Sequence, residues 1–327
     1  MTSVDLDVDL GVDLGGLRLR NPVVTASGCF ASGREMTRFF PLSTLGAVVT
    51  KSVTLEPRIG LPPPRMAETA SGMLNAIGLQ NPGVDAWMAK DLPWLAAQDV
   101  PVIASIAGKT VEEYGRIARR LSASADVAAV EVNISCPNVE DRGIVFACRT
   151  GATAEAIAAV TSLLDVPVFA KLTPDVTDIA EIAHAAVSAG ATGVSLINTL
   201  LGMAIDTKTR RPKLAAGTGG LSGPAIKPVA IRAVHQVYEA LGPVPIIGIG
   251  GASSAEDIIE FVLAGASAVA IGTATFVNPS VIPEIIDGVA GWLRRHREPS
   301  IAALRGGVVQ GEGGRQRAGG RGSQGLG

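Results

Sequence analysis

The hydrophobic positions of this chain fall into short, nearly continuous runs that alternate with longer stretches of helical periodicity. Eight such runs occur at residues 23–26, 47–52, 102–106, 128–133, 168–172, 193–198, 245–248 and 268–272. Strands buried on both faces have this character, whereas strands with one solvated face alternate polar and apolar residues. The runs therefore predict eight strands of a parallel sheet.

The stretches between these runs carry signals of helices. Thr110 and Glu113 have the spacing of a capping box at the start of a helix, as do Ser253 and Glu256 before an amphipathic segment. Residues 189–194 and 264–269 are near-copies, each with a Gly where a helix would stop. This repetition of strand and helix favours a (β/α)8 TIM barrel with parallel core strands, and leaves a doubly wound open sheet as the alternative.

The two ends of the chain differ from this pattern. We predict a short N-terminal β-hairpin before the first core strand. The last 22 residues include ten Gly and three Arg with scarcely any apolar content, so they cannot offset their ordering entropy. We expect one barrel domain over residues 1–303 and a disordered Gly/Arg-rich tail over residues 304–327. The tail lacks the aromatic residues with which RNA-binding segments stack on bases.

The composition narrows the function classes. The chain has 327 residues, of which 47% are hydrophobic and 18% charged, and its formal net charge is −2. It has neither the basic field that attracts nucleic acid nor an apolar run long enough to cross a membrane. The acidic first residues are unlike a secretory signal, so we expect a cytoplasmic protein. Three widely spaced cysteines fit neither a disulfide scaffold nor a metal site.

Polar residues stand at the ends of several predicted strands, where (β/α)8 barrels carry their reactive groups. Lys51, Asn133, Lys171 and the pair Asn198 and Thr199 occupy such positions. Any one of them could be a solvated rim residue. Four strand ends with polar groups directed to one mouth favour a binding site.

Cys136 follows the fourth strand within the segment Asn-Ile-Ser-Cys-Pro-Asn. A lone cysteine is usually a small buried hydrophobe. However, lysine neighbours can lower the thiol pKa from about 8.5, so a thiolate base near neutral pH is the functional alternative.

Glycine clusters surround the seventh and eighth strands, at residues 217–223, 248–251 and 272–273. Glycine lets the backbone approach a ligand closely, and barrels commonly bind phosphate with the loops after these two strands. Together the clusters predict a site for a phosphorylated cofactor.

Several of these segments resemble the dihydroorotate dehydrogenase family, over residues of about 9 to 292. The resemblance is carried by residues 75–83 (Asn-Ala-Ile-Gly-Leu-Gln-Asn-Pro-Gly), 133–138 and 219–223. Within the family, residues 198–206 and 211–214 are most similar to the class 1B catalytic subunit.

The resemblance implies one flavin mononucleotide (FMN) per chain across the barrel mouth. The FMN-binding residues that it implies are Ser27, Lys51, Ser52, Ser105, Asn133, Lys171, Ile197, Gly223, Gly250, Gly251, Gly272 and Thr273. The implied residues for dihydroorotate or orotate are Lys51, Asn75, Ala76, Ile77, Gly78, Leu79, Asn133, Asn198 and Thr199. Ser105 departs from the family pattern, which has an Asn here.

The implied reaction belongs to pyrimidine biosynthesis. Cys136 would remove the proton from C5 of dihydroorotate while a hydride passes from C6 to FMN. Lys171 would stabilise negative charge on the reduced ring. Membrane-associated class 2 relatives use Ser as the base, so a Cys here argues against that class.

The reoxidation of the flavin implies a partner. The sequence shows no strand–GxGxxG–helix unit and no four-cysteine cluster. The class 1B resemblance implies a homodimer of catalytic subunits within a heterotetramer, whose second subunit carries FAD and a [2Fe-2S] cluster and reduces NAD+.

Four alternatives stay open from the sequence. A class 1A-like enzyme would use fumarate as acceptor, and a related enzyme would act on a reduced pyrimidine without a carboxylate. A flavin-free barrel lyase or isomerase would use Lys171 as a Schiff base. The fourth alternative is a non-catalytic flavin-binding subunit.

Overall fold

An eight-stranded parallel sheet forms the centre of the computed structural model, which describes residues 7–135 and 148–309. The strand order is β3-β16-β15-β10-β9-β8-β7-β4. The strands are β3 (Val23–Thr25), β4 (Val48–Val49), β7 (Val102–Ile106), β8 (Ala129–Asn133), β9 (Val168–Leu172), β10 (Gly193–Leu196), β15 (Ile246–Ile249) and β16 (Ala268–Ile271). Every residue of these strands is buried, so the prediction of eight doubly covered strands is confirmed.

The two outer strands of this order, β3 and β4, meet and close the barrel. Val24 and Ala47 form a parallel bridge. Beyond this bridge, the Thr25 side chain bonds to the backbone of β4. Its Oγ1 donates to Val49 O at 3.0 Å and accepts from Val49 N at 2.8 Å. The fold is therefore a closed barrel and not the open doubly wound sheet.

Strand β4 is shorter than the predicted run of residues 47–52. The Lys51 amide turns away from the neighbouring strand and donates to Ala31 O, in the loop that follows β3, at 3.0 Å. Pairing with β7 resumes where Val53 N donates to Ser105 O at 2.9 Å. This local departure places Lys51 beside the end of β3.

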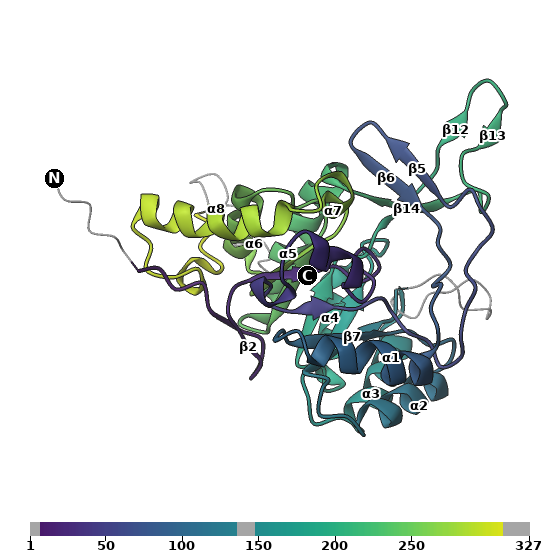
Figure 1. Ribbon diagram of the computed structural model, residues 1–327, viewed down its shortest axis with the longest axis horizontal. Helices are drawn as coiled ribbons and strands as arrows, with labels where there is room; N and C mark the ends of the chain where they lie inside the picture. Colours follow the sequence, from purple (N-terminus) through teal and green to yellow (C-terminus); the bar gives the residue numbers. More distant parts are fainter. Residues whose placement is uncertain (1–6, 136–147, 310–327) are drawn as a thin grey trace, which may run out of the picture.

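Helices cover the outside of the barrel (Figure 1). The long ones are α1 (Val84–Ala96), α2 (Val111–Leu121), α3 (Thr150–Thr161), α4 (Ile179–Ser188), α5 (Lys227–Leu241), α6 (Ala255–Ala264) and α8 (Val281–His296). Shorter pieces are α7 (Ala274–Val277), η1 (Arg34–Arg38), η2 (Leu42–Thr44), η4 (Pro224–Ile226) and η5 (Ala302–Leu304).

The helix caps agree only in part with the predicted capping boxes. At α2, Thr110 Oγ1 accepts from Glu113 N as predicted, but the Glu113 carboxylate accepts from Lys109 N. At α6, the prediction of Ser253 with Glu256 is wrong by one residue, and the box is Ser254 with Asp257. The Asp257 carboxylate accepts from the amides of both serines, so the shorter acid serves better at this position.

A four-stranded antiparallel sheet and a hairpin extend from one end of the barrel (Figure 1). The sheet has the order β11-β14-β6-β5, and its strands are β5 (Met66–Thr69), β6 (Gly72–Asn75), β11 (Leu200–Gly202) and β14 (Gly219–Ser222). The hairpin pairs β12 (Ile205–Asp206) with β13 (Arg211–Pro212). These strands were not predicted, because they are short, half-exposed and rich in glycine, and lack a clear hydrophobic run.

The chain ends are described in part. The predicted N-terminal hairpin is confirmed as β1 (Val12–Asp13) paired with β2 (Arg18–Leu19). Beyond the predicted boundary at residue 303, Leu304 is buried and Arg305 donates to backbone oxygens of the barrel. The predicted tail from residue 310 onward lies outside the described residues, and the division into domains stays a prediction. None of the helices described is long and apolar enough to span a membrane.

Candidate active site

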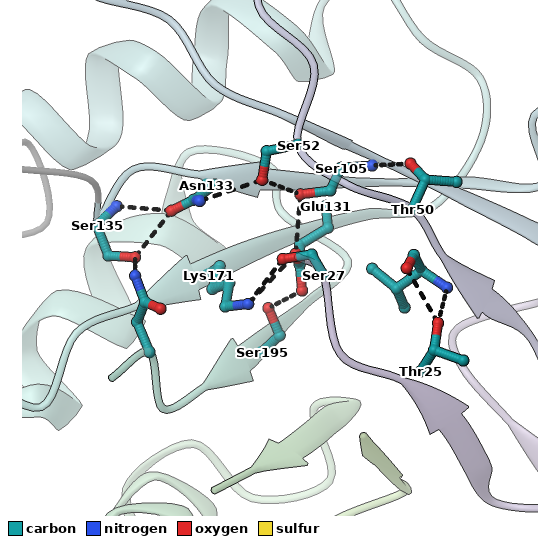
Figure 2. A network of polar contacts seen from close by, with 12 residues as sticks. Thr25, Ser27, Thr50, Ser52, Ser105, Glu131, Asn133, Ser135, Lys171 and Ser195 are labelled. Carbon is teal, nitrogen blue, oxygen red and sulfur yellow. Dashed lines mark hydrogen bonds and ion pairs between the residues drawn. The ribbon is translucent and has the colours of Figure 1, made fainter. Parts of the chain in front are cut away.

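Two of the predicted strand-end residues, Asn133 and Lys171, lie within a buried hydrogen-bond network at the barrel mouth (Figure 2). Asn133 is the last residue of β8, and it is in register with Lys171 of β9. Lys171 is in turn in register with Ser195 of β10. Parallel strands direct laterally paired side chains to the same face, so these three side chains share the inside of the barrel.

Lys171 is held between two strands by oxygen partners. Its Nζ donates to Ser27 Oγ at 3.0 Å and lies 3.7 Å from Oε1 of Glu131. The side chains of Lys171 and Glu131 are 5% and 1% exposed, so this is a buried ion pair. Ser27 lies two residues after the end of β3, and its bond to Lys171 connects the first and fifth core strands at the mouth.

Glu131 was not among the predicted site residues, although it is central to the network. Ser105 Oγ donates to one carboxylate oxygen at 3.0 Å, and Ser195 Oγ donates to the other at 2.9 Å. The signal that could have found it is an acidic residue inside an otherwise apolar strand, since such a charge needs partners.

Ser52, Ser105 and Asn133 form a chain across β7 and β8. Ser52 Oγ and Ser105 Oγ are 2.8 Å apart, and Asn133 Nδ2 donates to Ser52 Oγ at 3.3 Å. Ser105 is fully buried, so its short hydroxyl bonds to Ser52 and Glu131 within the barrel. Its contact with a flavin stays a prediction.

Asn198 joins this network through Ser135, another residue that sequence reasoning missed. Asn198 Nδ2 donates to Ser135 Oγ at 2.7 Å, and Ser135 Oγ donates to Asn133 Oδ1 at 2.9 Å. The amide of Thr199 donates to Asn198 Oδ1 at 3.0 Å. Ser135 directly precedes Cys136, and Cys136 itself lies outside the described residues.

Lys51 and Cys29 lie at the same mouth. Lys51 Nζ would be 3.5 Å from a Cβ placed on Gly28, so its ammonium lies against the loop after β3. Burial raises the pKa of the Cys29 thiol above its usual value, while the charges of Lys171 and Lys51 oppose that rise. Cys29 is therefore a weak nucleophile at neutral pH.

The turn from Asn75 to Leu79 closes one side of the mouth. Asn75 Nδ2 donates to Gly220 O at 3.3 Å, which ties the turn to β14. The buried Asn81 donates to Leu79 O at 2.7 Å and to Thr54 Oγ1 at 2.8 Å. These bonds hold the end of the turn to the residues that follow β4. The backbone of the turn is therefore held in a fixed position in which it can contact a ligand.

The predicted phosphate loops pack backbone to backbone. A Cβ on Gly251 would lie 2.7 Å from Gly223 O, and a Cβ on Gly223 would lie 2.7 Å from Gly72 Cα. Both glycines have positive φ, at 79° and 94°, which L side chains rarely adopt. Thr273 Oγ1 donates to Ser222 Oγ at 2.8 Å beside them. A cavity of about 760 Å³ borders Gly223, Gly251 and Thr273.

The remaining predicted cofactor residues connect these loops to the barrel. Ile197 is buried, and its amide donates to Ile249 O at 2.9 Å. A Cβ on Gly250 would lie 3.4 Å from the Ile197 side chain, and one on Gly272 would lie 3.2 Å from the Cys29 sulfur. The structure thus brings the predicted residues of the strand ends and the glycine loops together, whereas Ala76 N donates to Arg65 O and Ile77 O accepts from Leu61 N, so the substrate role of these two residues stays a prediction.

Comparisons with known proteins show which family this chain is similar to. A family model described as dihydroorotate dehydrogenase matches residues 9–293. Proteins named dihydroorotate dehydrogenase B (NAD(+)), catalytic subunit, from Anoxybacillus flavithermus and Geobacillus kaustophilus are 59% and 57% identical over 277 residues, which is 85% of this chain and 88% of each relative. The protein of that name from Bacillus pumilus is 53% identical over 89% of this chain and 94% of its own length.

A solved structure shows the same fold. The crystal structure of DHODH from Eimeria tenella in complex with ferulenol superposes with a TM-score of 0.79 and 22% sequence identity, over 92% of this chain and 89% of that one. The (β/α)8 barrel formed by the described residues therefore also occurs in a solved structure.

Proposed function

Since this chain belongs to the dihydroorotate dehydrogenase family, we propose that it is the FMN-containing catalytic subunit of a class 1B enzyme. It oxidises dihydroorotate to orotate in pyrimidine biosynthesis. The observation that carries the assignment is the convergence of Lys171, Asn133 and Asn198 at one barrel mouth, bordered by the glycine cradle of Gly223 and Gly251.

The residues present fit FMN. Gly223 and Gly251 let the loops pack backbone to backbone beside the cavity that also borders Thr273, and glycine loops of this kind suit a phosphate group. Lys171, Asn133 and Ser27 supply a cation, an amide and a hydroxyl at the mouth, as the polar edge of a flavin requires. When bound, FMN supplies hydride-accepting chemistry that no amino-acid side chain provides.

We assign the substrate to the side of the mouth formed by the Asn75 to Leu79 turn. Dihydroorotate carries a carboxylate and ring amides, which need a cation and several donors and acceptors when they leave water. Lys51 supplies the cation, while Asn133 and Asn198 supply amides that the Ser135 hydroxyl holds in fixed orientations. The Thr199 amide bonds to Asn198 and orients it further.

Cys136 is assigned as the base that removes the C5 proton. The residue lies outside the described part of the chain, so the assignment rests on its position directly after Ser135 and on the family resemblance. Ser135 hydrogen-bonds to two proposed substrate residues, and this bonding fixes the residue that directly precedes Cys136 in the chain.

We propose that electrons leave through a second subunit. The relatives' name specifies NAD(+) and a catalytic subunit, so a separate electron-transfer subunit, carrying FAD and a [2Fe-2S] cluster, accounts for the acceptor. The described residues contain no group of His, Cys, Asp and Glu suited to a metal. A homodimer of catalytic subunits within a heterotetramer in the cytoplasm completes the proposal.

The test is the visible spectrum of the purified full chain before and after anaerobic addition of dihydroorotate. Bleaching of a bound flavin supports the proposal, and NAD+ should reoxidise it at full rate only with the partner subunit present. A flavin that stays oxidised, or a protein that cannot be reconstituted with FMN, contradicts it. Reoxidation by fumarate in place of NAD+ would assign the chain to a class 1A-like enzyme.

A further inference from the structure

Glu131 is an acidic side chain inside the barrel that none of the proposed steps uses. Its side chain is 1% exposed, on the strand that ends in Asn133. A buried carboxylate is costly unless charges and hydrogen bonds compensate it. Its partners therefore indicate its role.

Two hydroxyl groups fix the plane of the Glu131 carboxylate. Ser105 on β7 donates to Oε1 at 3.0 Å, and Ser195 on β10 donates to Oε2 at 2.9 Å. Since each oxygen has its own donor, the carboxylate has one preferred orientation (Figure 2). The two donors also disperse the negative charge of the carboxylate. The carboxylate therefore compensates a neighbouring cation but does not cancel the electric field of that cation.

The neighbouring cation is Lys171, whose Nζ lies 3.7 Å from Glu131 Oε1 and donates to Ser27 Oγ at 3.0 Å. An ammonium group has three donors and Ser27 takes one of them, so donors remain to be directed at a ligand in the mouth. Burial disfavours the charged form of an ammonium group, whereas a nearby carboxylate favours it.

We infer that Glu131 is a positioning residue that acts through Lys171. It holds the Lys171 ammonium in place and directed at the bound flavin, and so raises the flavin's reduction potential. The inference rests on the proposed function, because it requires FMN beside Lys171. If the ion pair served the fold alone, Glu131 would affect stability without affecting the potential.

The reduction potential of bound FMN in four full-length proteins tests this: wild type, E131Q, K171M and the double variant. We expect E131Q to weaken the preference for reduced over oxidised flavin at least tenfold, a fall of about 30 mV for a two-electron couple. K171M should also lower the potential, and adding E131Q to K171M should change it no further. E112Q, at an exposed glutamate of α2, is the matched control and should leave the potential unchanged.

An unchanged or raised potential in E131Q overturns the inference, as does an equal additional fall in the K171M background. If E131Q does not fold, E131D decides, because it keeps the charge but withdraws the carboxylate by one methylene. A fall in the potential of E131D supports the inference, and an unchanged or raised potential overturns it. The proposed function, and not this inference, is refuted if the wild-type protein binds no FMN, or if dihydroorotate does not bleach the FMN that the protein binds.

Discussion

Asn198 donates from Nδ2 to the Ser135 hydroxyl at 2.7 Å, and this bond joins the end of β10 to the residue that precedes Cys136. The same hydroxyl donates to Asn133 at 2.9 Å. One small side chain thus links two amides of the proposed substrate site to the chain segment that carries the proposed base.

Replacing Ser135 with Ala should impair the reaction while the barrel stays folded. The change leaves Asn198 Nδ2 without the Ser135 hydroxyl, at a cost of about 1–3 kcal/mol for the amide left unsatisfied, while Asn133 Oδ1 keeps its bond from the Ser135 backbone amide at 3.3 Å. We expect kcat/KM for dihydroorotate to fall at least about tenfold. Anaerobic stopped-flow measurement of flavin bleaching checks this, with S122A at an exposed serine as control. Equal rates for S135A and wild type would remove Ser135 from the site.

Replacing Cys136 with Ala tests the base directly. The flavin should remain bound, because the proposed FMN contacts lie on other residues, but its reduction by dihydroorotate should slow about 10²- to 10⁴-fold. Single-turnover bleaching measures this step separately from reoxidation. A rate near that of wild type would refute the role of Cys136, and loss of the flavin would indicate that the thiol serves the cofactor site.

Replacing Gly251 with Ala should weaken FMN binding. The new Cβ would lie 2.7 Å from Gly223 O, and the residue has a φ of 79°, so the cradle must shift to admit it. We expect the dissociation constant for FMN, measured by fluorescence quenching, to rise at least about tenfold, given typical strain costs of roughly 1–3 kcal/mol. G151A in α3 is the matched control, because nothing lies within 4 Å of its added Cβ. Unchanged FMN affinity in G251A would place the phosphate elsewhere.

The sequence predicted the barrel better than it predicted the site network. Strands such as Val168–Leu172 are continuous apolar runs, so their burial on both faces is evident from the chain alone. The interactions of Glu131, Ser135 and Ser195 depend on the lateral register of strands distant in sequence, which no local pattern encodes. The strands β11 and β14 were missed for a related reason, since the pairing of β11 with β14 and of β14 with β6, and not their own hydrophobicity, makes them strands.

Arg305 should stabilise the barrel without influencing the reaction. Its guanidinium donates to Gly265 O and Val244 O at 2.8 and 2.6 Å and lies over the Tyr238 ring. Val244 precedes β15, so these contacts are at the amino ends of the strands, opposite the mouth. We expect R305A to lose about 1–3 kcal/mol of unfolding free energy, measured by thermal unfolding, while bleaching rates stay unchanged. The exposed Arg294 provides the control R294A, and equal stability of the two variants would contradict the role of Arg305.

The contact between Lys227 and Asp257 should make stability depend on pH in the acid range. Burial alone would raise the pKa of Asp257, but hydrogen bonds from Lys227 and Ser253 outweigh it and lower the pKa. A carboxyl group with a lowered pKa in the folded state adds stability above its ordinary pKa, and that stability is lost as the pH falls through the lowered value.

The unfolding temperatures of wild type and D257N, measured against pH, therefore should differ most near neutral pH and approach each other as the pH falls below about 4, the ordinary range of an aspartate pKa. Lys227 Nζ lies 2.6 Å from Asp257 Oδ1, and this ion pair leads to the same prediction because it requires an ionised Asp257. D287N on α8 serves as control, with no comparable trend expected. A difference between wild type and D257N that stays constant from neutral to acid pH would show that Asp257 acts as a neutral helix cap.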